Sequence, residues 1–165
     1  MTTFNPDLQP VCLRHPDRAF TGKAPALATV ADAYGDEFAE AWLAVEIFNL
    51  ALSSGVKDVH DYRDYLPMAK LLVPEFSYLK VTELLYFFGK CKTGRYGKFY
   101  GHIDFMQIGE ALREFCNGER RAVHEHYRAI REEEAKRETN ETAVCIKKYL
   151  AERGATSLLS LALNS

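Results

Sequence analysis

The residues whose types could do chemistry are concentrated between Lys90 and Asp104, where glycines, cations and aromatic residues alternate. The segment reads KCKTGRYGKFYGHID and holds three glycines, four lysine or arginine residues and three tyrosine or phenylalanine residues. Basic side chains can contact the phosphates of a nucleic-acid strand, and aromatic rings can stack on its unpaired bases. The candidate nucleic-acid-binding residues are Lys90, Lys92, Arg95, Tyr96, Lys98 and Tyr100.

The same segment has a second interpretation, in which it is a tight connection between two helices. Its glycines, Gly94, Gly97 and Gly101, permit backbone conformations with positive φ, and its aromatic rings would then pack inward. It is neither a Walker phosphate loop nor a dinucleotide fingerprint, because the glycine-lysine-hydroxyl order is missing and no strand precedes it. Nucleic-acid contact and a structural turn both stay open at this point.

No other group of residues predicts catalysis, a metal site or a cofactor. His124 and His126 are two positions apart, which places them on different sides of a helix and not around a shared metal ion. Cys91 stands between two lysines whose charge favours its thiolate, yet no candidate base lies near it in the sequence. We therefore expect a non-enzymatic protein with no catalytic residues, no metal and no cofactor.

Composition and charge predict a cytoplasmic globular protein. The chain has 165 residues, 47% of them hydrophobic and 27% charged, which suits one domain with a real core. No apolar run is long enough to span a membrane, and the first 25 residues contain no secretory h-region. The net charge of −2 gives no overall polyanion-binding signature, but residues 81–103 hold four cations and one anion.

Apolar residues recur at helical spacing along most of the chain, and no alternating segment is long enough for a convincing strand. The sequence therefore predicts an all-α fold, a single helical domain of about five to six helices with a long charged C-terminal helix. Helices are expected over 26–33, 36–53, 58–73, 83–91 and from 104 onward. Pro67 predicts a kink or a helix start, Pro74 predicts a helix end, and Asp104 predicts an N-cap.

Three regions follow from these patterns. Residues 1–24 hold three of the six prolines and predict an irregular arm, and residues 25–121 form the helical core. Residues 122–165 are a charged helical extension and a leucine-rich tail. Residues 119–138 carry six cations and six anions, which indicates a solvated helix, and Gly118 weakens the prediction that this helix is continuous.

A set of short motifs follows this order along residues 25–121. The most specific is Lys-x-Gly-x-Tyr-Gly-x-x-Tyr-x-x-Ile-Asp, from Lys92 to Asp104, and Glu119-Arg120 closes the set. The order resembles a family of uncharacterised helical proteins of phages and integrated mobile elements of gut-type bacteria. Because such proteins are found near replication genes, the resemblance implies a replication accessory role, such as helicase loading or recruitment.

Two functions are therefore expected. In the first, the protein contacts single-stranded or forked DNA through the loop at residues 90–104. In the second, this loop is purely structural, and the charged helix or the leucine-rich tail docks on a replicative helicase or another replication protein.

Overall fold

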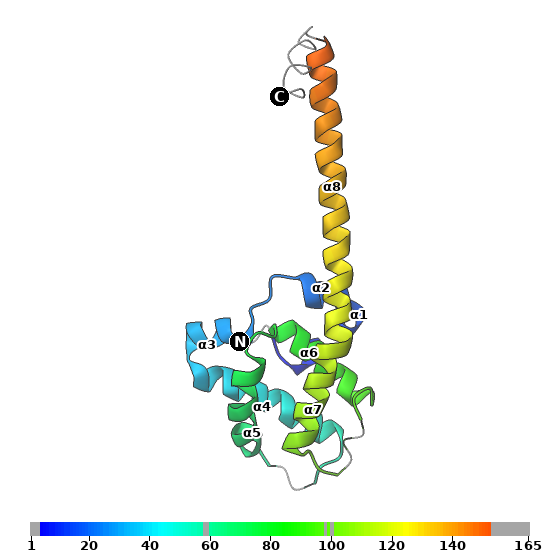
Figure 1. The fold of residues 1–165 in the computed structure, drawn as a ribbon. Coiled ribbons are helices and arrows are strands. Elements are labelled where there is room, and N and C mark those ends of the chain that lie inside the picture. Colours follow the sequence, from blue (N-terminus) through cyan, green and yellow to red (C-terminus); the bar gives the residue numbers. More distant parts are fainter. Residues whose placement is uncertain (1–3, 58–59, 98, 100, 153–165) are drawn as a thin grey trace. The chain divides into compact units, whose positions relative to one another are not determined.

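The computed structural model describes residues 4–57, 60–97, 99 and 101–152, and most of these residues are helical (Figure 1). The α-helices are α1 (Gln9–Arg14), α2 (Pro16–Thr21), α3 (Leu27–Tyr34), α4 (Asp36–Ser53), α5 (Leu66–Phe76), α6 (Val81–Lys92), α7 (Phe105–Phe115) and α8 (Arg121–Glu152). Two 3-10 turns, η1 (Pro6–Leu8) and η2 (Tyr62–Tyr65), and one π-helical turn, η3 (Cys116–Arg120), complete the set. The described residues contain no strand beyond an isolated bridge between Ala26 and Lys80, so the predicted all-α fold is confirmed.

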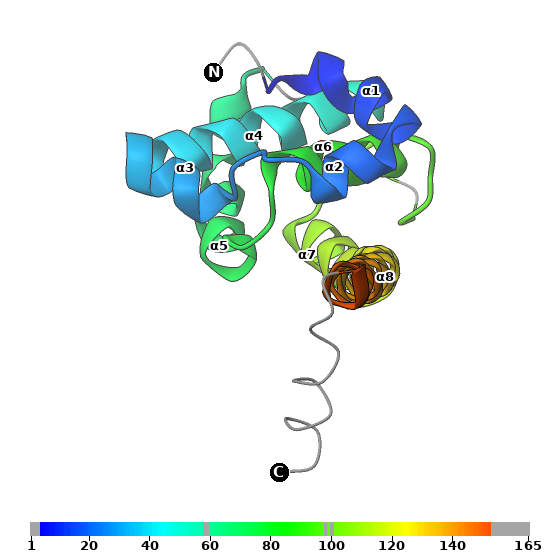
Figure 2. The same cartoon turned by 90° about the horizontal axis from the view of Figure 1, so that it is seen from above.

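The chain divides into two compact units, residues 1–123 and residues 124–165. In the first unit α4 and α6 lie at the centre (Figure 2), with α1 and α2 packed on α6 and with α3 and α5 packed on α4. Four large side chains from different helices, Phe20, Leu50, Phe87 and Phe115, are at most 1% exposed. Burial of this apolar surface is the main force that holds the helices together.

The prediction of an irregular N-terminal arm was wrong for the described residues. Pro10 and Pro16 stand in the first turns of α1 and α2, where a backbone N–H would have no helical partner in any case. The ring of Phe20 is buried in the core. The Lys80 ammonium donates to the carbonyls of Phe20 and Gly22 at 2.9 and 2.8 Å, which fastens the end of α2 to the start of α6.

The segment predicted as one helix over 58–73 is divided in two. Residues 60–65 include the turn η2, and α5 begins with Pro67 in its first turn, so the predicted helix start near this proline is confirmed. Pro74 was expected to end the helix, but α5 continues to Phe76. Proline removes one backbone hydrogen bond without preventing the next residues from keeping helical angles, so the helix ends two residues late.

The helix that follows the loop begins as predicted. The Asp104 carboxylate accepts the N–H of Met106 at 2.9 Å, which confirms Asp104 as the N-cap of α7. The helical backbone continues through Gly118 as the π-helical turn η3 and passes directly into α8.

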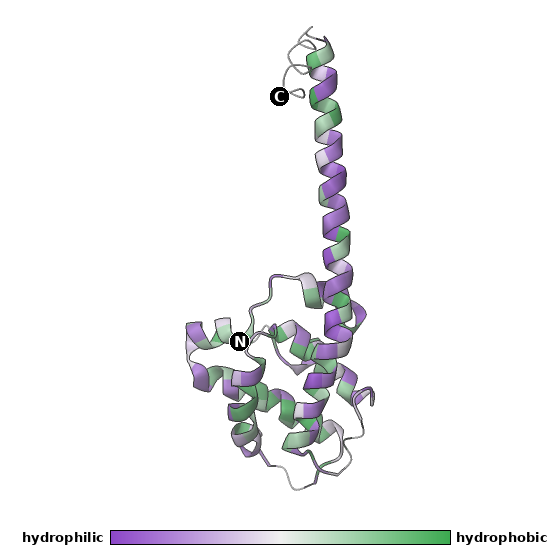
Figure 3. Ribbon diagram, in the orientation of Figure 1, coloured by the Kyte–Doolittle hydropathy of each residue, from purple (hydrophilic) through white to green (hydrophobic). Residues whose placement is uncertain are grey.

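The predicted long charged C-terminal helix is confirmed as α8, which has no buried residue. Two ion pairs at helical spacing support it, Arg128 with Glu132 at 3.8 Å and Arg137 with Glu141 at 3.7 Å. Each such exposed pair is worth about 0.3–0.5 kcal/mol. Figure 3 shows that α8 is hydrophilic over most of its length and more hydrophobic toward its C-terminal end. The leucine-rich tail lies outside the described residues.

Candidate functional site in the basic loop

The loop begins with a Schellman motif that ends α6. The N–H of Gly94 donates to the carbonyl of Cys91 at 2.9 Å, and the N–H of Arg95 donates to the carbonyl of Lys90 at 3.1 Å. Gly94 has a φ of 79°, a conformation that costs glycine little and other residues more. This glycine therefore has a conformational role in turning the chain away from α6.

The described aromatic residues of the loop face inward. Tyr96 and Phe99 are only 6% and 4% exposed. The ring centroid of Tyr96 lies 5.4 Å from that of Phe87 and 6.1 Å from that of Phe115, so the ring fills the space between α6 and α7. The prediction that Tyr96 offers a stacking face to a base was wrong, because burial between two helices removes both faces from solvent. Tyr100 lies outside the described residues.

The two lysines at the end of α6 make contacts within the protein. Lys90 Nζ lies 3.5 Å from a carboxylate oxygen of Glu119 and 5.2 Å from the ring centroid of Tyr86. Lys92 Nζ donates to Asn49 Oδ1, and burial lowers the pKa of this ammonium despite the nearby carboxylates. Both ammonium groups, predicted to contact phosphates, are thus engaged by protein groups in this conformation.

The side chain of Arg95, like that of Lys92, is exposed. Its guanidinium carbon lies 5.6 Å from the ring centroid of Tyr96, close enough for a cation-π interaction. Lys98 lies outside the described residues. Of the predicted nucleic-acid-binding residues that the structure describes, Arg95 is the best placed to meet a phosphate.

A carboxylate that the sequence did not single out as functional, Glu119, holds the loop to the helices. The hydroxyls of Tyr86 and Tyr96 donate to its two oxygens at 2.5 and 2.6 Å. Burial alone would raise the pKa of Glu119, but the two tyrosine hydroxyls and Lys90 outweigh it and the pKa lies below its ordinary value. The pKa of both tyrosines is raised, mainly by burial and secondly by the hydrogen bond to Glu119. We call Glu119, Tyr86, Tyr96 and Lys90 the Glu119 cluster.

The next residue of the π-helical turn makes a second buried contact. Arg120 Nε donates to Glu83 at 3.2 Å, and Glu83 is fully buried. The same carboxylate accepts the backbone N–H of Lys80 at 3.0 Å, so it also caps α6. A buried carboxylate is tolerated only when such partners satisfy it. Glu119 and Arg120 together therefore fasten η3 to α6.

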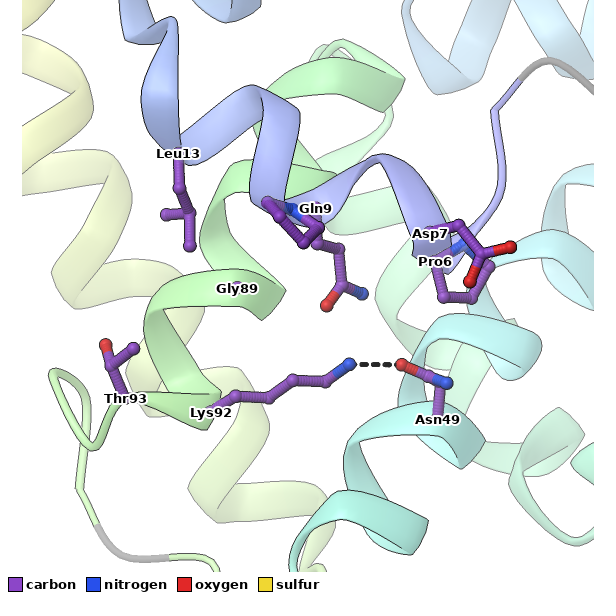
Figure 4. A pocket seen from close by; sticks show the side chains of 9 residues that line it. Pro6, Asp7, Gln9, Leu13, Asn49, Gly89, Lys92 and Thr93 are labelled. Carbon is purple, nitrogen blue, oxygen red and sulfur yellow. Dashed lines mark hydrogen bonds between the residues drawn. The ribbon is translucent and has the colours of Figure 1, made fainter.

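A further buried acid stands apart from the loop, on α4. Gln9 Nε2 on α1 donates to Glu46 Oε2 at 2.7 Å, and these residues are 2% and 0% exposed. Burial raises the pKa of Glu46 from its ordinary value of 4.5 to about 7. Figure 4 shows the Gln9 amide pointing from α1 toward the Lys92–Asn49 hydrogen bond, beside a hollow of about 390 Å³.

The structure bears on the metal and thiol chemistry that the sequence analysis considered. They contain no group of three or more His, Cys, Asp or Glu side chains placed to hold a metal ion. Cys91 is buried, and burial raises the pKa of its thiol, which is opposite to the thiolate expected from the flanking lysines. No helix in the described ranges is long and apolar enough to cross a membrane.

Comparison with models of known protein families matches residues 62–154 to a family of unknown function (DUF6633). The chain belongs to this family. No curated protein and no solved structure matches the chain.

The DUF6633 match divides the buried acids into two groups. Glu83, the Glu119 cluster and the whole of α8 lie within the matched residues. Gln9 and Glu46 precede them. The loop at residues 90–104 also lies within the match, and it supplies Lys90 and Tyr96 to the Glu119 cluster.

Proposed function

We propose that this protein is a non-enzymatic interaction adaptor, in which the loop at residues 90–104 is structural and helix α8 docks on a partner protein. The observation that carries this proposal is that α8 has 32 residues and none of them is buried. A polar helix of this kind gains little from tertiary packing and is marginal by itself, so a partner that covers it adds stability.

The docking face is proposed from the C-terminal end of α8. Tyr149 and Leu150 lie three and four residues after Ile146, which places all three on one side of the helix. The side chains of Ile146 and Tyr149 are 54% and 52% exposed. Such an apolar stripe fits the hydrophobic groove of a protein that binds helices.

The partner proposed is a replicative helicase, or another replication protein, met in the cytoplasm. This part of the proposal rests on the resemblance to helical proteins of phages and mobile elements that are found near replication genes. The DUF6633 match supports membership of a family of unknown function and goes no further.

Replacing Ile146 by aspartate is expected to weaken binding of the full chain to the helicase encoded by the same genome by at least about tenfold, which is roughly 1.4 kcal/mol. Val144→Asp is the matched control, because Val144 is also exposed, at 65%, but lies about 200° around the helix from Ile146. Biolayer interferometry measures both affinities. Equal affinities for both variants and the unaltered chain would reject this face, and no binding at all would reject this partner.

We propose nucleic-acid contact as a second function, because the exposed Arg95 lies in the one segment with a clear local excess of cations. The contact would be to single-stranded or forked DNA. The buried ring of Tyr96 and the engaged ammonium groups of Lys90 and Lys92 rank this function behind the adaptor.

Affinity for a fluorescent single-stranded oligonucleotide falls with salt, and replacing Arg95 by alanine is expected to make this fall less steep. The magnitude of the slope of log affinity against log salt concentration should decrease by about 0.7, the value for one lost phosphate contact. Fluorescence anisotropy over a series of salt concentrations measures the slope. Arg131→Ala on α8, another exposed arginine, is the control and should leave the slope unchanged. Absence of any salt-sensitive binding at low ionic strength would end the DNA proposal.

A further inference from the structure

The contact between α1 and α4 contains two buried oxygen atoms without a hydrogen-bond partner, Gln9 Oε1 and Glu46 Oε1. They belong to the two side chains that already share one bond, from Gln9 Nε2 to Glu46 Oε2. An unsatisfied buried polar atom costs about 1–3 kcal/mol, so two of them in one contact need an explanation.

Both oxygens are buried within the protein. Glu46 is 0% exposed and Gln9 is 2% exposed, although Gln9 and Glu46 each line a neighbouring hollow. An ionised carboxylate at this depth would also carry a large desolvation cost with only one hydrogen bond to offset it. A single proton removes the charge and supplies the missing donor.

We propose that Glu46 carries a proton in the folded protein and that its hydroxyl donates to Gln9 Oε1, which closes a carboxylic acid–carboxamide ring between α4 and α1. The proton comes from solvent when the chain folds and returns to solvent when the ring opens. The ring gives both oxygens a partner, because Glu46 then accepts through one oxygen and donates through the other. We call this pair the α1–α4 clasp.

The charged and titratable groups near Glu46 belong to several elements that pack against α4. Lys92 on α6 favours the ionised form, and Asp7 on η1 opposes it. Cys12 on α1 is a neutral thiol whose pKa is raised by burial and then by Glu46. Tyr62 on η2 lines a hollow that Glu46 also lines. Burial exceeds the opposing effects of the Gln9 hydrogen bond and of Lys92, and the pKa of Glu46 accordingly stands at about 7.

The clasp makes the attachment of α1 sensitive to pH. The pKa of Glu46 is higher in the folded chain than in the unfolded chain, so the folded state binds more protons between those two values. Stability therefore falls as pH rises from about 4.5 to about 7 and then levels off. Above pH 7 Glu46 loses the proton that donates to Gln9 Oε1, and α1 separates from α4 more often.

Hydrogen exchange of the full chain between pH 6 and pH 8 tests this device. After correction for the intrinsic pH dependence of exchange, the protection of the α1 amides is expected to fall about tenfold. This is the factor by which loss of the Glu46 proton, with a pKa of about 7 in the folded chain, favours opening of the clasp at pH 8 over pH 6. Glu46→Gln should abolish the fall, because a second carboxamide can make the same two bonds without a proton. Glu37→Gln, an exposed acid on the same helix, should keep it.

A titration of the Glu46 carboxyl carbon by NMR tests the proton itself and does not depend on any variant. A midpoint near 7 supports the clasp, and a midpoint near the ordinary value overturns it. Gln9→Leu supplies a second variant, which should show low α1 protection at both pH values. Equal pH dependence of the unaltered chain and Glu46→Gln would also overturn the proposal.

Discussion

Replacing Phe115 by alanine is expected to lower the free energy of unfolding by about 3–5 kcal/mol, the usual cost of truncating a fully buried phenylalanine. The ring centroid of Phe115 lies 6.1 Å from that of Phe20, 5.5 Å from that of Phe87 and 6.1 Å from that of Tyr96. These rings belong to α2, α6 and the loop. Alanine at this position would leave a cavity where all three segments meet α7.

Urea unfolding followed by tryptophan fluorescence measures this loss, because Trp42 is the chain's single tryptophan and is buried in α4. Met106→Ala on the same helix is the control. Its side chain is 65% exposed, so the change should stay within about 0.5 kcal/mol. Similar losses for both variants would contradict the central place given to Phe115.

The helices that were predicted well are those with a long apolar stripe. α4 spans Asp36–Ser53 as expected, because Phe38, Trp42 and Val45 keep helical spacing over several turns. α1 and α2 have six residues each, too few to show a period, and their prolines looked like breaks. The burial of Cys12, Ala19 and Phe20 against the other helices shows that this segment is part of the core.

The site was harder to predict because its residue types serve both interpretations. Tyr96 beside Gly97 suits a stacking platform and an inward-facing ring equally well, and the position of α7 decides between them. Glu119 is 23 residues from Tyr96 in the sequence. The π-helical turn that directs its carboxylate toward the Tyr96 hydroxyl has no local sequence signature. Glu46 did leave a signal, since it lies four residues from both Trp42 and Leu50 on the buried stripe of α4.

Replacing Glu119 by alanine is expected to lower the free energy of unfolding by about 3 kcal/mol, because the change leaves two part-buried tyrosine hydroxyls and one ammonium without their acceptor. Urea unfolding by Trp42 fluorescence again measures the loss. Glu114→Ala is the control, since Glu114 is an exposed acid on α7 and should change stability by less than about 0.5 kcal/mol.

The pH dependence of this loss separates a charged acceptor from simple packing. The pKa of Glu119 is lower in the folded chain than in the unfolded chain, so its stabilisation is present above the unfolded pKa and disappears as pH falls through the folded pKa. The difference between the unaltered chain and Glu119→Ala should therefore shrink on acidification. A difference that stays constant with pH would mean that Glu119 acts through packing alone.

The same substitution also bears on the two proposed functions. Glu119→Ala frees the Lys90 ammonium and loosens the loop around Tyr96. If the loop contacts DNA, the freed cation should raise affinity for a single-stranded oligonucleotide at low salt. If the loop is structural and α8 is the docking element, DNA affinity should stay negligible and helicase binding should persist wherever the chain remains folded.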